Sequence, residues 1–202
     1  MATLITLQSL LLPLLLFTLL ATGTPGPNNI LLTLSGSQFG FKKTIPFILG
    51  IRFGILLLFC LMGVGIGTII VNNPNLHFAL KLLGACYLTY LAFKIAFSTS
   101  HNNTHQQVAL ISFKKGILMQ FINPKAMTMV LSCIAAFSLP GEHYIASIIQ
   151  AALVFTLVGV FSNILWALFG VAINSLLSTT KAQLIFNRTL AVLTLLAIVL
   201  LF

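Results

Sequence analysis

The sequence predicts an all-α integral membrane protein with six transmembrane helices, arranged as two inverted three-helix repeats. Of its 202 residues, 59% are hydrophobic and only 5% are charged, whereas a soluble domain carries about 25% charged residues. With roughly 20 apolar residues needed for each helical span, the length accommodates about six spans and no soluble domain. Prolines also interrupt two of the apolar runs in the same way. We therefore expect a single transmembrane domain over residues 1–202.

The predicted spans follow one another with short polar connections, and they cover residues 4–39, 44–71, 76–97, 116–137, 144–177 and 188–202. The longest polar connection divides the chain into repeat one (residues 1–98), a linker (99–113) and repeat two (114–202). Because each half has an odd number of spans, the two halves face in opposite directions. Residues 1–22 have no positively charged segment before their apolar run, so we expect the first helix to be retained rather than cleaved.

Positive charges mark one side of the predicted bundle. The formal charge of +9 would suggest nucleic-acid binding in a soluble protein, but most of these residues flank apolar segments, so no nucleic-acid partner is expected. Connections one-to-two, three-to-four and five-to-six carry Lys42, Lys43, Lys94, Lys114, Lys115, Lys181 and Arg188. Since cytoplasmic loops are enriched in Lys and Arg, both termini are predicted to be periplasmic, in a multi-pass protein of the bacterial inner membrane.

The two interrupted runs predict a binding site. Thr24-Pro25-Gly26-Pro27-Asn28 breaks the first span and Asn123-Pro124-Lys125-Ala126 breaks the fourth, because proline removes a backbone donor and clashes with the preceding turn. In a membrane such a break is tolerated inside protein or beside a watery cavity. Both breaks lie roughly 12–22 Å from the cytoplasmic face, near the middle of the bilayer. Packed helices with simple kinks are the alternative.

Individual polar residues add candidates for this site. Lys125 is unusually deep for a cation, and it could pair with the carboxylate of a substrate. The amides of Asn28, Asn29, Asn123 and Asn163 could bind either a substrate or the broken backbone. Arg52 and Lys81 are expected to be interfacial anchors whose long side chains reach the membrane surface.

Several functions lack the residues that they require. Glu142 is the only acidic residue and lies in a predicted turn, so no intramembrane carboxylate could serve an aspartyl protease. There is no His-Glu-x-x-His sequence for a zinc site, and Cys60, Cys86 and Cys133 have the scattered positions of buried apolar residues. We expect no enzyme activity, catalytic residue, metal or cofactor. A non-transporting membrane scaffold and a channel or permease for another small solute stay open.

The chain resembles the LysE/RhtB family of bacterial amino-acid exporters in both broken segments and in Leu80-Lys81-Leu82-Leu83-Gly84-Ala85-Cys86-Tyr87-Leu88. Residues 159–168 further resemble the branch that exports cysteine and O-acetylserine. The resemblance implies secondary-active export of small amino acids or derivatives from the cytoplasm by antiport, with the substrate held at Thr24, Pro25, Gly26, Pro27, Asn28, Asn123, Pro124, Lys125 and Asn163. Without an intramembrane acid, a neutral amino acid is the expected substrate. Lipid is a further partner, and the coupling ion and a homo-oligomeric state stay open.

Overall fold

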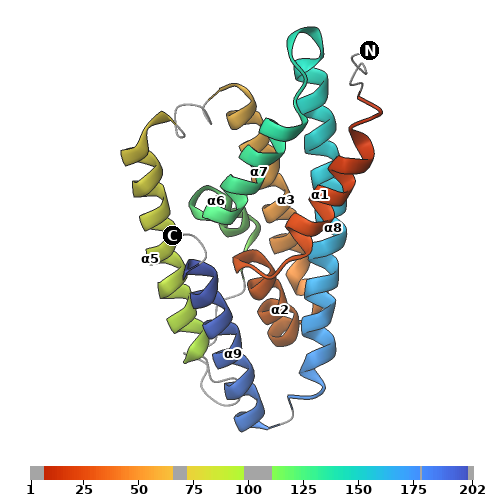
Figure 1. The fold of residues 1–202 in the computed structure, drawn as a ribbon. Coiled ribbons are helices and arrows are strands. Elements are labelled where there is room, and N and C mark those ends of the chain that lie inside the picture. Colours follow the sequence, from red (N-terminus) through yellow and green to blue (C-terminus); the bar gives the residue numbers. More distant parts are fainter. Residues whose placement is uncertain (1–6, 66–71, 98–110, 178, 200–202) are drawn as a thin grey trace.

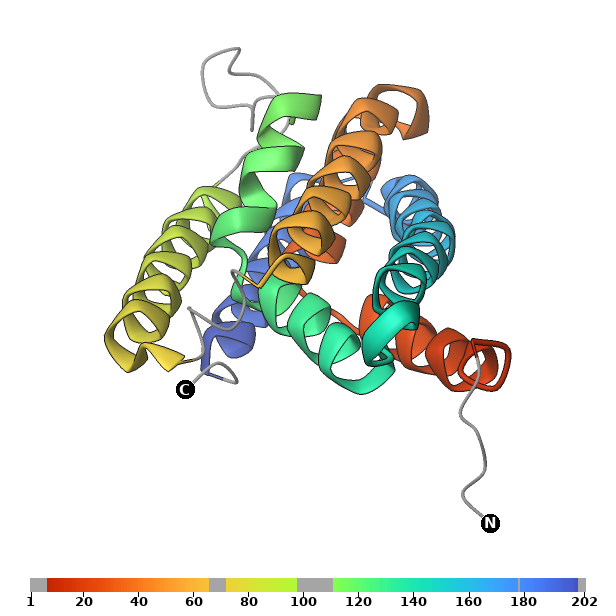
Figure 2. The ribbon, with the colours of Figure 1, turned by 90° about the horizontal axis from the view of Figure 1, so that it is seen from above.

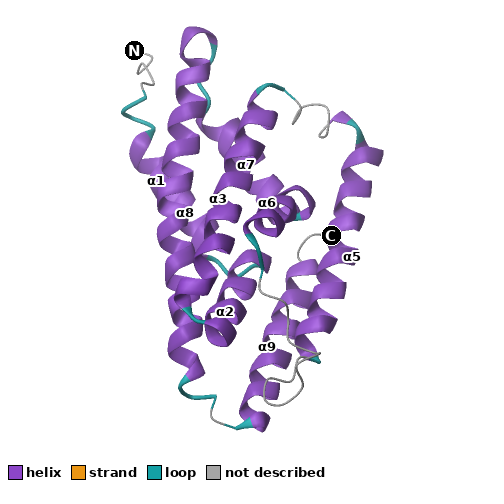
Figure 3. Ribbon diagram, turned by 180° about the vertical axis from the view of Figure 1, so that it is seen from behind, coloured by secondary structure: helices purple, strands orange, loops and turns teal. Residues whose placement is uncertain are grey.

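The computed structural model describes residues 7–65, 72–97, 111–177 and 179–199, which form helices and no strand. The chain runs through α1 (Leu11–Gly23), α2 (Pro27–Phe39), α3 (Phe41–Gly63), α5 (Pro74–Ala96), α6 (Phe113–Ile122), α7 (Pro124–Phe137), the short 3₁₀ helix η1 (Gly141–His143), α8 (Tyr144–Asn174) and α9 (Thr180–Val199). Figure 1 and, from behind, Figure 3 show these helices as one elongated bundle. The all-α prediction is therefore confirmed.

Each predicted apolar run corresponds to a helix or to a broken pair of helices. The first run is α1 with α2, and the fourth is α6 with α7. The predicted start of the last run at Arg188 is wrong, because the Thr179 side chain accepts a hydrogen bond from the Ala182 amide (3.1 Å) and so caps a helix that already begins at Thr180. Most of the linker 99–113, with His101 and His105, and the end of the second run at Val71 lie outside the described residues.

The helices pack in a reciprocal pattern. In the first half α2 packs on α3, and in the second half α7 packs on α8. Across the halves α1 packs on α8, α6 packs on α3, and α5 packs on α9. Viewed from above, α6 lies alongside α3, and α1 lies next to α8 (Figure 2). Each half therefore makes the same kinds of contact with the other half.

Glycines allow the closest of these helix crossings. A Cβ atom at Gly54 would come within 2.6 Å of the Gln120 side chain, and one at Gly116 would come within 2.9 Å of the Phe47 carbonyl oxygen. Small residues let helix backbones approach in this way in membrane proteins. The glycines thus place α6 directly against α3, with Gln120 completely buried between them.

The outer surface of the bundle is apolar. Leu12 and Leu20 on α1, and Ile145 and Leu157 on α8, are each at least 66% exposed. Such faces suit lipid rather than water. Among the described helices, α3 and the helix Gly141–Asn174 are long and apolar enough to cross a membrane alone, and α6 with α7 adds a third crossing if the bent pair counts as one.

Candidate functional site

Two prolines determine the first break. The residue before a proline is driven out of the helical region, and both Thr24 (φ −70°, ψ 147°) and Gly26 (φ −178°, ψ 176°) are extended. Helix α1 consequently ends at Gly23, and α2 begins with Pro27 at its first position, where a missing N–H costs nothing. Between them the carbonyl groups of Thr24 and Pro25 are available for contacts outside a helix.

The second break uses the same device. Asn123 is extended (φ −91°, ψ 101°), Pro124 occupies the first position of α7, and the Asn123 side chain accepts a hydrogen bond from the Lys125 amide (3.2 Å). The axis turns by 70° between α6 and α7. Both predicted breaks are therefore present, and each ends with the N-terminus of a new helix.

Lys125 joins the two breaks. Its ammonium donates to the Thr24 carbonyl oxygen (3.0 Å), the Thr24 hydroxyl (2.8 Å) and the Pro25 carbonyl oxygen (3.1 Å). A lysine ammonium has three donors, so all of them are used. Gly26 makes the approach possible, because a Cβ atom there would lie 2.8 Å from the Lys125 Cδ.

A pair of amides makes a second connection between the breaks. Asn28 Nδ2 donates to Gln120 Oε1 (2.8 Å), and Gln120 Nε2 donates back to Asn28 Oδ1 (3.3 Å). The neighbouring Asn29 instead satisfies the broken backbone, since its Nδ2 donates to the carbonyl oxygens of Thr22 (2.8 Å) and Thr24 (2.9 Å). Segments about a hundred residues apart in sequence are thus linked by both charged and neutral hydrogen bonds.

Arg52 does not anchor the protein at the membrane surface, and that prediction is wrong. It is the central residue of α3, only 6% exposed, and its side chain turns inward toward α8. Its Nη2 donates to Asn163 Oδ1 (3.2 Å), and its Nη1 donates to the Phe155 carbonyl oxygen (3.5 Å). At the centre of a 23-residue helix, roughly 17 Å from either end, the guanidinium cannot reach an interface. The side chain of Lys81 lies outside the described residues.

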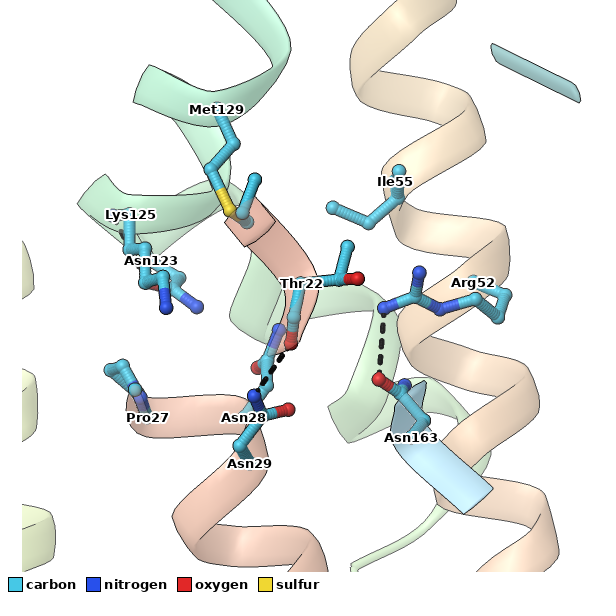
Figure 4. Close-up of a pocket in the computed structure, with 12 residues that line it drawn as sticks. Thr22, Pro27, Asn28, Asn29, Arg52, Ile55, Asn123, Lys125, Met129 and Asn163 are labelled. Atoms are coloured by element: carbon cyan, nitrogen blue, oxygen red, sulfur yellow. Dashed lines mark hydrogen bonds between the residues drawn. The ribbon is translucent and has the colours of Figure 1, made fainter. Parts of the chain in front are cut away.

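A cavity lies where these groups converge. Figure 4 shows Arg52 and Asn163 on one side and Asn123 and Lys125 on the other. The cavity volume is about 20 Å³, close to the space that one water molecule requires. The lining residues are Ala21, Thr22, Gly26, Pro27, Asn28, Asn29, Arg52, Ile55, Asn123, Lys125, Met129 and Asn163.

The predicted site residues divide into those that line this cavity and those that support it. Gly26, Pro27, Asn28, Asn123, Lys125 and Asn163 line it, whereas Thr24, Pro25 and Pro124 shape the breaks beside it. Gln120 was not predicted as a partner of Asn28, and the prediction for Arg52 was wrong, although a cation inside an apolar run was a usable signal. Within the described ranges, no three His, Cys, Asp or Glu side chains are grouped closely enough to hold a metal ion.

The apolar bundle with a polar cavity between broken helices has the form of a membrane transporter. The LysE type translocator family matches this chain over residues 19–202. The chain therefore belongs to that family, and it is a transporter rather than an enzyme. The resemblance seen in the sequence motifs is confirmed.

Similar proteins include two that are described as cysteine/O-acetylserine efflux proteins. One is from Escherichia coli (strain K12) and the other from Shigella sonnei (strain Ss046). Each is 30% identical to this chain over 155 residues, which cover 76% of this chain and 78% of the relative. No solved structure matches the chain significantly. The family and these relatives place the chain among proteins of amino-acid efflux.

Proposed function

We propose that this protein exports small neutral amino acids or their derivatives across the bacterial inner membrane by alternating access. The substrates are of the cysteine, O-acetylserine, homoserine and threonine type. They bind between the first break (Thr24–Asn28) and the second break (Asn123–Lys125), with Asn163 on the facing helix. Rocking of the two halves then exposes this site to the cytoplasm and to the periplasm in turn.

The observation that carries this proposal is the bridge made by Lys125. Its ammonium lies within 3.1 Å of three oxygen atoms of Thr24 and Pro25, so one cation connects the broken helices of both halves. A scaffold has no need of paired breaks or of a cation that joins them, since a charge within a membrane domain is expensive. Since the cavity volume is only about 20 Å³, an amino acid can enter only if these contacts open.

The packing pattern supports the six-span inverted repeat. Exchanging α1, α2, α3 and α5 with α6, α7, α8 and α9 converts most of the larger helix contacts into contacts that are also observed. For example, α1 on α8 becomes α6 on α3, and α5 on α9 is converted into itself. A pseudo-two-fold axis in the membrane plane has this property. In the proposed topology α1 with α2, α5 and α9 also span, and both termini are periplasmic.

The exposed helix ends suit a zwitterion. The N-termini of α2 and α7 offer amide donors and the positive end of a helix dipole, which favour negative charge in the cavity. The carbonyl groups after α1 already bind one ammonium, that of Lys125. The only acidic residue of the chain, Glu142, lies in η1 rather than at the cavity. A cationic side chain on the substrate would therefore have no counter-ion, which favours neutral amino acids.

Export is tested by producing the protein in a bacterial strain that lacks its own exporters and profiling the amino acids that appear in the medium. We expect small neutral amino acids or derivatives to accumulate outside the cells. Lys125→Ala should reduce this efflux at least about tenfold, because losing a charged hydrogen-bond partner removes more than about 1.4 kcal/mol. The matched control Lys114→Ala removes an exposed lysine of α6 and should have no effect.

Membrane abundance of each variant, measured with a C-terminal tag, separates loss of activity from loss of protein. Unchanged efflux by Lys125→Ala would overturn the role assigned to Lys125. The absence of any exported amino acid with the unaltered chain would favour the scaffold. Saturable counterflow in proteoliposomes, in which an internal substrate accelerates uptake of labelled substrate, distinguishes a carrier from a channel.

A further inference from the structure

Arg52 is a buried cation that has no carboxylate partner. The chain contains a single acidic residue, Glu142 in η1, and Arg52 bonds instead to neutral oxygen atoms of Asn163 and Phe155. The two distances, 3.2 and 3.5 Å, are longer than the usual 2.9–3.0 Å. Its Nε has no hydrogen-bond partner. A buried charge with incomplete hydrogen bonding is costly unless something else satisfies it.

Asn163 presents a second unused donor at the same place. Its side-chain oxygen accepts from Arg52, while its Nδ2 is buried without a partner. Arg52 is 6% exposed and Asn163 is 1% exposed, and both line the cavity. Neighbouring donors with a positive charge and no acceptor are complementary to a ligand that carries two negatively charged oxygens.

Lys125 is less suited to this task. All three of its donors already bind oxygen atoms of the first break, at 2.8–3.1 Å. A carboxylate at Lys125 must displace at least one of these contacts, whereas Arg52 Nε and Asn163 Nδ2 have no acceptor to displace. A guanidinium also matches a carboxylate with two parallel hydrogen bonds, which an ammonium cannot do.

We propose that Arg52, assisted by Asn163, is the subsite that recognises the α-carboxylate of the exported substrate. This inference rests on the proposed export function and adds a requirement to it. The substrate must carry a free carboxylate, and amides or esters of the same amino acid are rejected. The substrate carboxylate is the counter-ion that the chain itself does not provide for Arg52.

The sharpest test replaces Asn163 with aspartate. Asn163→Asp preserves the shape of the side chain and supplies a carboxylate about 3.2 Å from Arg52 Nη2. The resulting internal ion pair competes with the substrate carboxylate for Arg52. We expect this variant to have an unchanged or higher melting temperature in detergent. Its apparent KM for L-cysteine counterflow in reducing buffer should nevertheless rise about 30-fold or more, as when a buried charge partner is lost.

Substrate discrimination provides the second readout. With the unaltered protein, L-cysteine should inhibit counterflow of labelled L-cysteine at least about tenfold more strongly than L-cysteinamide. In Arg52→Gln this preference should fall to nearly equal inhibition, whereas Arg52→Lys should retain part of it. Lys43→Gln is the matched control, because it removes an exposed positive charge from the start of the same helix. It should keep the full preference.

The outcomes separate this inference from the proposed function. If the unaltered protein transports no amino acid in proteoliposomes, the proposed function fails and takes this inference with it. If transport occurs but Asn163→Asp leaves the KM unchanged, or Arg52→Gln keeps the acid-over-amide preference with only a lower maximal rate, Arg52 is a structural residue. Export would then stand, and the carboxylate subsite would be refuted.

Discussion

Because Gly159 on α8 has no side chain, the Arg52 guanidinium can lie against the helix backbone there. We predict that a side chain at position 159 would displace it. The guanidinium lies against this glycine so closely that a Cβ atom at position 159 would overlap Arg52 Nη1. In Gly159→Ala the guanidinium must therefore move away from α8. That movement breaks its hydrogen bonds to Asn163 and to the Phe155 carbonyl oxygen.

The expected cost follows from two contributions. Overpacking a tight site costs about 1–3 kcal/mol, and losing long hydrogen bonds to a charged group adds about 1–2 kcal/mol. We therefore expect the free energy of unfolding, measured in mixed micelles with increasing SDS, to fall by about 2–5 kcal/mol. If Arg52 is the carboxylate subsite, the KM for L-cysteine counterflow should rise in parallel.

A double-mutant cycle with Arg52→Met tests the cause. If Gly159→Ala acts by displacing the guanidinium, it should cost at least about 1 kcal/mol less when Arg52 is already replaced. Gly170→Ala, also on α8, is the control, because a Cβ there would overlap the Thr33 carbonyl oxygen of α2 rather than Arg52. Its cost should simply add to that of Arg52→Met. A purely additive cycle for Gly159→Ala would refute the reasoning.

Two further predictions concern the second break and the topology. Gly84→Val should lower the free energy of unfolding by about 1–3 kcal/mol, since a Cβ atom there would lie 2.7 Å from Pro124 Cδ. Gly23→Ala should be neutral in the same SDS titration, because no atom lies within 4 Å of a Cβ at that position. In a cysteine-free background, Glu142→Cys should react with a membrane-impermeant maleimide in intact spheroplasts, and Lys43→Cys only after the membrane is permeabilised. Reversed labelling would overturn the proposed orientation.

The breaks could be predicted from sequence because their cause is local. Thr24 and Gly26 each precede a proline, which disfavours the helical region for them, and both are extended. The same holds for Asn123 before Pro124. That Lys125 stands at the second break also followed from its position directly after Pro124. A single proline is not sufficient, since α3 continues through Pro46. The chain opens where Pro-Gly-Pro and Asn-Pro sequences interrupt the apolar runs.

The partners of the buried polar groups could not be predicted in the same way. Arg52 and Asn163 are 111 residues apart, and Asn28 and Gln120 are 92 apart, so only the packed bundle brings them together. The sequence of a single apolar run does not reveal which way the Arg52 side chain turns, so the prediction placed it at the interface. The inward direction depends on Gly159 of another helix, which offers the guanidinium a place to lie.

The guanidinium at the centre of α3 also has a consequence for electrical insulation. An export protein must pass its cargo without letting protons or potassium ions run back down the membrane potential. An arginine side chain remains charged in proteins. Arg52 lies beside a cavity of about 20 Å³, where little water can screen its charge. A stray cation that reaches this depth meets a fixed positive charge, as in pores where arginine excludes protons and other cations. We therefore expect the same group to resist a leak current across the membrane.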